Sequence, residues 1–190
     1  MKRTAKLSFV IVLLLSVSLI VRAQNTPTQL SDVAKALECL DQKKSSLWTL
    51  ERGEPFGGSK DVLVYKYVSG GRGVLVRFMY YLSDAEANKS FKSFGEYASA
   101  HHLKKIQNLG DEAFSWGYDE SIVMRKGNLM VYVSAGSDID RLLPELEAAE
   151  TSALSRREVE LLTRNFARMM NKTLSNLSEA CQRPHLYYIF

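Results

Sequence analysis

The stretch Asp61-Val-Leu-Val-Tyr-Lys-Tyr-Val-Ser-Gly-Gly-Arg-Gly-Val-Leu-Val-Arg-Phe-Met-Tyr-Tyr-Leu82 decides the fold of this chain. Its β-branched and aromatic residues alternate on either side of a glycine-rich turn at 69–73. This pattern is typical of two strands joined as an antiparallel hairpin. A second hairpin is predicted where 122–125 and 129–134 flank Lys126-Gly-Asn128, because Gly and Asn tolerate positive φ. One more strand is predicted around 103–109.

Helices are predicted before, between and after these strands along the chain. Apolar residues recur every three or four positions over 31–41 and over 155–178, and also after Ser83. Ser83-Asp-Ala-Glu86 and Ser155-Arg-Arg-Glu158 are capping boxes that begin the last two helices. Pro144 interrupts 138–153, which we expect to be a helical insertion.

The fold class predicted from this order is α+β. We expect an antiparallel sheet of about four to five strands built from hairpins, with the amphipathic helices packed mainly on one face. Residues 24–190 have the length of a single domain whose core is 61–136.

Residues 1–23 have the three parts of a secretory signal peptide. A basic start is followed by the apolar run 7–21 and by small residues at Val21 and Ala23. The run has about 15 residues, fewer than the roughly 20 that cross a bilayer, so we expect cleavage rather than a retained anchor. The protein is therefore expected to be secreted or periplasmic, with no membrane span after cleavage.

The net positive charge of the chain comes from this segment. The formal charge is +4, and the signal segment contains four basic residues and no acidic one. The remainder carries 21 basic and 21 acidic residues and is formally neutral. A nucleic-acid partner is not expected, because such proteins present a net positive surface.

Two cysteines, Cys39 and Cys181, lie near opposite ends of the exported part of the chain. An even, minimal pair in an oxidising compartment predicts one disulfide. Two buried free thiols are the alternative.

Few residues indicate catalysis, and we expect no cofactor and no metal site. His101 and His102 are adjacent, so on a strand they would point to opposite faces. A hydrolase or metal-dependent enzyme using these histidines with Asp111 or Glu112 is an alternative that requires the side chains to converge.

The second face of the predicted sheet is the stronger candidate. If the alternation continues through the turn, Val62, Val64, Val76 and Phe78 form the core face. The opposite face then presents tyrosine and arginine side chains, which suit a ligand or partner because each combines a flat apolar part with polar atoms. The candidate surface residues are Tyr65, Tyr67, Arg77, Tyr81 and Tyr132.

Three segments together resemble a family. They are Leu109-Gly-Asp-Glu-Ala-Phe114, Val123-Met-Arg-Lys-Gly-Asn128 and Leu154-Ser-Arg-Arg-Glu158. The arrangement is similar to uncharacterised bacterial secreted domains and lipoproteins of PsbP-like and LpqN-like α+β form. The resemblance implies a bacterial host and a non-catalytic, extracytoplasmic module that binds a small ligand, a lipid or a partner protein. This chain differs in lacking a lipidation cysteine.

The sequence thus predicts an exported binding or accessory module. Its alternatives are the enzyme above and a structural envelope protein whose helices mediate assembly.

Overall fold

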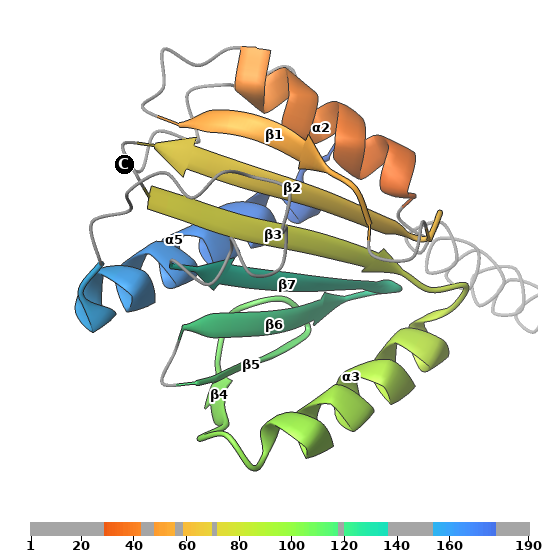
Figure 1. Ribbon diagram of the computed structural model, residues 1–190. Coiled ribbons are helices and arrows are strands. Elements are labelled where there is room, and N and C mark those ends of the chain that lie inside the picture. Colours follow the sequence, from red (N-terminus) through yellow and green to blue (C-terminus); the bar gives the residue numbers. More distant parts are fainter. Residues whose placement is uncertain are drawn as a thin grey trace, which may run out of the picture.

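The computed structural model describes residues 29–42, 48–55, 59–69, 72–117, 120–136 and 154–177. These residues form an α+β fold, as predicted, with the elements shown in Figure 1. The helices are α2 (Leu30–Gln42), α3 (Asp84–Ala98) and α5 (Arg156–Ser175). The strands are β1 (Thr49–Gly53), β2 (Val62–Ser69), β3 (Arg72–Tyr80), β4 (Lys104–Ile106), β5 (Glu112–Trp116), β6 (Ser121–Lys126) and β7 (Leu129–Ala135).

The described strands form one antiparallel sheet in the order β1-β2-β3-β7-β6-β5-β4. It has seven strands instead of the expected four to five, because β1 and β5 were not predicted. β1 is an edge strand with mostly exposed side chains, so its sequence has no apolar alternation. β5 follows directly on the turn at Gly110 and Asp111, and pairing with β4 and β6 on either side makes it a strand.

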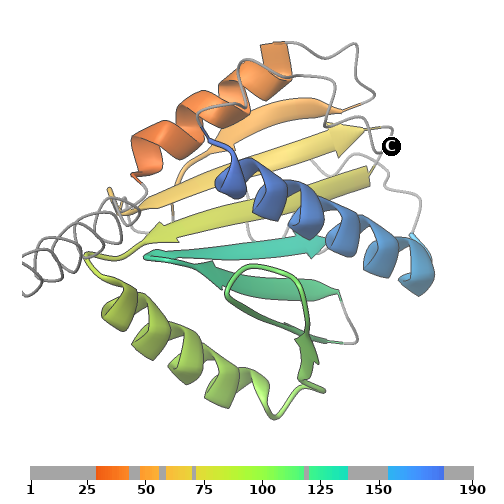
Figure 2. The same ribbon diagram turned by 180° about the vertical axis from the view of Figure 1, so that it is seen from behind.

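Helices α2 and α5 cover one face of the sheet. Figure 2 shows α5 crossing the strands with α2 beside it. Val33 and Leu37 of α2 and Phe166 of α5 belong to one buried cluster with Val76 and Phe78 of β3. This cluster is the main core.

Helix α3 packs against the opposite face, so the helices are not confined to one side. Its Phe91 and Ala98 are buried with Phe114, Val123 and Met130 of β5, β6 and β7. Two helix layers therefore enclose part of the sheet between them, which explains why neighbouring residues of β6 are buried on both faces.

The register of the first hairpin differs from the one that the predicted assignment of side chains to the two sheet faces requires. Ser69 pairs with Arg72, whereas a five-residue turn at 69–73 would have paired Val68 with Val74. This difference of one residue in register moves every side chain of β2 to the opposite face of the sheet relative to β3. Tyr65 pairs with Val76 and therefore lies on the core face.

The expected exposure of Tyr65 and Tyr67 is wrong as a result. Both are buried in the main core, at 2% and 3% exposure. The ring of Tyr67 packs edge-on against Phe166 of α5, with 4.9 Å between centroids. Val62 and Val64, expected on the core face with Val76 and Phe78, lie instead on the face that carries Arg77, where Val64 is still buried.

Both predicted helix starts are capped by serine. Ser155 Oγ accepts from the backbone N–H of Glu158, and Glu158 accepts in return from the backbone N–H of Ser155 at 2.9 Å. At α3, Ser83 Oγ accepts from the N–H of Glu86, but the Glu86 carboxylate accepts from Leu82 instead. Only the α5 cap is a reciprocal capping box.

The predicted signal peptide (1–23), the predicted insertion (138–153) and Cys181 lie outside the described residues. No helix among the described residues is long and apolar enough to cross a membrane.

Candidate binding surface

Two of the predicted surface residues meet on the face that carries α3. Arg77 of β3 and Tyr132 of β7 are register partners. The Arg77 guanidinium carbon lies 5.8 Å from the centre of the Tyr132 ring. Both side chains are half-buried, and this geometry is a cation–π contact.

A row of rings continues from Tyr132 towards the end of α3. The Trp116 ring lies 5.4 Å from Tyr132 and 5.0 Å from Phe94. Phe94 is 6.5 Å from Tyr97, between ring centroids. We call Tyr132, Trp116, Phe94 and Tyr97 the aromatic row.

The aromatic row lies at the margin of the α3 contact and remains partly open to solvent. Its inner side rests on the buried rings Phe91 and Phe114. Trp116 and Phe94 are half-buried, whereas Tyr97 is 71% exposed. The row thus combines rigid support with accessible ring surface.

The two ends of the row are polar. At one end lies Arg77, and at the other the His101 ring is 5.9 Å from that of Tyr97. Near the first end, Tyr132 Oη and Ser121 Oγ share a hydrogen bond of 3.2 Å, and Ser121 Oγ donates to Ser134 Oγ at 3.1 Å. Hydroxyl groups therefore border the rings.

Tyr81 lies on the same side of the sheet but has a packing role. Its ring lies partly buried in the cluster under α3, and its hydroxyl shares a 2.7 Å hydrogen bond with Ser90 of that helix. Its backbone N–H donates to the Asn128 carbonyl. Tyr81 thus joins α3 to the second hairpin and is not part of the row.

The histidines and acids of the enzyme alternative do not come together. The His101 carbonyl accepts from the N–H of Gly117, just after the last residue of β5, whereas Glu112 is the first residue of β5 and Asp111 precedes it. The residues of β5 that separate the histidines from the acids span on the order of 15 Å. No group of three His, Cys, Asp or Glu side chains among the described residues could hold a metal ion.

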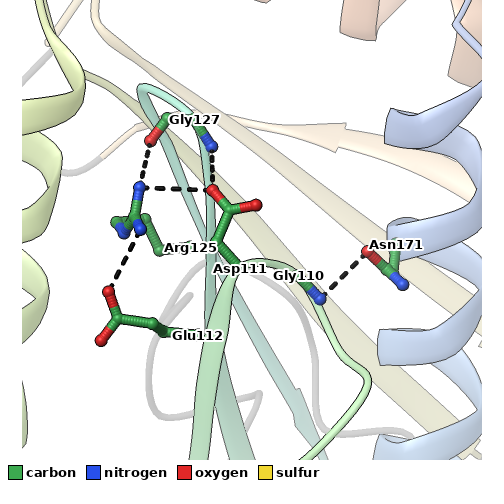
Figure 3. Close-up of polar contacts among 6 residues, drawn as sticks. All are labelled: Gly110, Asp111, Glu112, Arg125, Gly127 and Asn171. Carbon is green, nitrogen blue, oxygen red and sulfur yellow. Dashed lines mark hydrogen bonds and ion pairs between the residues drawn. The ribbon is translucent and has the colours of Figure 1, made fainter.

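Asp111 and Glu112 instead hold Arg125 of β6, as Figure 3 shows. Arg125 Nη1 lies 3.3 Å from Asp111 Oδ2, and its Nη2 donates to Glu112 Oε1 at 3.1 Å. Nη1 also donates to the Gly127 carbonyl at 3.1 Å, while the Gly127 N–H donates to Asp111 Oδ2 at 2.7 Å. We call Gly110, Asp111, Arg125 and Gly127 the turn clamp.

The turn clamp joins the segments 109–114 and 123–128, which are distant in the chain from the helix that follows them. Gly110 has φ of +63°, and an added Cβ would stand 2.4 Å from the Arg125 carbonyl oxygen. The Gly110 N–H donates to Asn171 Oδ1 of α5 at 3.1 Å. These residues fix the second hairpin to the preceding turn and to a helix, which is a structural role.

Cys39 lies half-buried on α2. Its predicted partner, Cys181, is outside the described residues, so the disulfide stays a prediction.

Sequence reasoning missed Trp116, Phe94 and Tyr97 as members of a surface. Phe114 and Trp116 alternate with small residues within β5, and this alternation was the available signal. It was overlooked because β5 was not predicted, and the approach of α3 to β5 is a tertiary contact.

The aromatic row, Arg77 and the neighbouring hydroxyls could contact a ligand or partner. Among the described residues of this surface, no nucleophile is paired with a base. Comparison of the chain with protein-family models, with curated proteins and with solved structures gave no match.

Proposed function

We propose that this chain is an exported, non-catalytic binding or accessory module and that the aromatic row is its contact surface. The observation that carries the proposal is the unbroken contact of rings from Tyr132 to Tyr97, with Arg77 at one end. Export is supported by the signal pattern of residues 1–23. The resemblance to PsbP-like and LpqN-like domains favours the same class.

The chemistry of the row favours an organic ligand or partner with flat apolar faces and some polar edges. Aromatic rings supply contact area at low cost in conformational entropy, because each has only two side-chain torsions. The Arg77 guanidinium adds hydrogen-bond donors beside the rings. A small ligand, a lipid or a loop of a partner protein has such faces.

Two other functions receive less support. The enzyme requires His101 or His102 beside Asp111 or Glu112, and these residues lie at opposite ends of β5. A structural envelope protein requires self-assembly, so a monodisperse monomer in solution would argue against it.

The first test is mass spectrometry of molecules that co-purify with the protein from the exporting host. The wild type is compared with two variants of the row, Trp116→Ala and Tyr97→Ser. Tyr97 is exposed, so its replacement should leave the fold intact. Leu161→Ser is the matched control, because Leu161 is an exposed apolar residue on α5, away from the row.

A species enriched on the wild type and on Leu161→Ser, and depleted on both row variants, would support the proposal. Equal loading of all four proteins, or no loading, would reject the row as the contact surface. Trp116 fluorescence gives a second readout in a Trp48→Phe background, since Trp48 packs in the core against Phe166.

A further inference from the structure

A small hollow lies on the other face of the sheet, between α5 and the loop that joins β4 to β5. Its volume is about 60 Å³, and its lining residues are Ile106, Gln107, Asn108, Leu109, Ile122, Arg164 and Arg168. Organic-ligand pockets usually have about 300–1,000 Å³. The hollow therefore admits one functional group and not a whole cofactor.

The charged part of the hollow comes from two arginines on one side of α5. Arg164 and Arg168 are four residues apart, so they lie one turn above each other. Arg164 Nη2 lies 3.0 Å from Glu160 Oε1, which holds its guanidinium in place. Arg168 is exposed and has no ion pair within the described part of the chain.

The charges that face the hollow favour an anion. Glu160 offsets Arg164, whereas the charge of Arg168 is not offset by an ion pair among the described residues. Guanidinium groups bind oxyanions with paired, charge-assisted hydrogen bonds.

The opposite wall of the hollow is held rigidly. The loop between β4 and β5 lies on the α5 side of the sheet in Figure 2. Gly110 donates to Asn171 of α5, and Asp111 donates to the Arg125 carbonyl. Asn108, with φ of +61°, lines the hollow within this loop, and its carboxamide can supply a further donor.

We infer that this hollow binds a small oxyanion group, a phosphate or a carboxylate, between Arg168, Arg164 and the loop at 107–109. The inference does not depend on the aromatic row, which lies on the opposite face of the sheet. A binding site on each face would let the domain hold an organic ligand and an anionic group independently.

The test is a titration of the isotope-labelled protein with inorganic phosphate and, separately, with acetate, followed by NMR. Sodium chloride at matched ionic strength is the reference. We expect saturable shifts of the backbone amides of 107–109 and of the Nε–H signals of Arg164 and Arg168. The anion that saturates at lower concentration identifies the preferred group.

Arg168→Gln should weaken binding of that anion by at least about fivefold, because a charge-assisted hydrogen bond is lost. Arg157→Gln is the matched control: it removes the same charge from an exposed position on the same helix, outside the hollow. We expect it to change the affinity by less than about twofold, as a distant exposed charge does in salt. Shifts that do not saturate with either anion, or equal weakening by the two variants, would overturn the inference.

Discussion

Asp111 binds Arg125 with both its backbone and its side chain. The Asp111 N–H donates to the Arg125 carbonyl at 2.8 Å, and its Oδ2 lies 3.3 Å from the Arg125 Nη1. The same Oδ2 accepts the N–H of Gly127 in the turn of the second hairpin. One acidic residue thus joins the start of β5 to the end of β6 and to the turn that follows.

The close approach at this point makes Gly110 sensitive to substitution. Gly110→Ala should lower the free energy of unfolding by about 2 kcal/mol or more, because positive φ and a backbone clash are combined. Chemical denaturation would measure the loss. Gly95→Ala is the control: its new Cβ would make ordinary contact with Phe114 at 3.5 Å, and alanine favours a helix by about 1 kcal/mol. A destabilised Gly95→Ala beside an unchanged Gly110→Ala would contradict this account.

Asp111→Ala and Glu112→Ala should differ although both remove an acid next to Arg125. Asp111→Ala should cost about 1–2 kcal/mol, because it leaves the Gly127 N–H without its acceptor. Glu112→Ala removes only an ion pair whose acid is nearly half exposed, a change worth about 0–1 kcal/mol. The two values would come from urea unfolding, and the reverse order would show that the ion pair dominates.

Tyr65 should make the fold sensitive to alkaline pH. Burial raises the pKa of its hydroxyl above the ordinary value of 10.0, a larger effect than the opposing charge of Arg52. A raised pKa in the folded state means that the contribution to stability is complete below pH 10 and is lost as pH rises through the folded pKa. Tyr65→Phe should therefore unfold less readily than the wild type above pH 10.

At neutral pH, Tyr65→Phe should be neutral or stabilising by up to about 1 kcal/mol, because the buried hydroxyl has no hydrogen-bond partner in the described residues. Thermal unfolding at pH 7 and above pH 10 would measure both effects. Tyr97→Phe, at an exposed position, serves as the control and should leave both values unchanged. A Tyr65→Phe protein that is less stable at both pH values would contradict the prediction.

Ser155→Ala should remove the reciprocal cap of α5 at a cost of about 1 kcal/mol at neutral pH. Hydrogen bonds from Ser155 lower the pKa of Glu158 below its ordinary 4.5. A lowered pKa means that this contribution is present above pH 4.5 and is lost as pH falls through the folded pKa. The difference between variant and wild type in thermal unfolding should therefore shrink below pH 4. Ser93→Ala, an exposed change within α3, should not show this pH dependence.

Cys39 and Cys181 are predicted to form a disulfide. Protein purified without reductant should then be two hydrogens lighter than its reduced form, as intact-mass spectrometry can resolve. Replacing both cysteines by serine should cost up to about 4–5 kcal/mol in the chain-entropy model, because the closed loop is long. Two thiols that react with an alkylating agent in the unreduced protein would refute the bond.

The local pattern of the sequence determined most elements of this fold. Alternation predicted β2, β3, β6 and β7, and helical spacing predicted α2, α3 and α5, the last two with serine caps. These features depend on side chains within a few residues of each other, so a single sequence contains them. β1 and β5 escaped prediction because hydrogen bonds from β2, or from β4 and β6, make them strands.

Only the tertiary structure decided which residues face one another. The register at Ser69 and Arg72 placed Tyr65 and Tyr67 in the core and left Arg77 on the opposite face with Tyr132. A shift of one residue in register exchanges the two faces of a strand, and the alternation of side chains in the sequence is compatible with either register. The aromatic row and the hollow beside Arg168 each depend on a helix docking against strands that are distant in the chain, and that contact is formed only by folding.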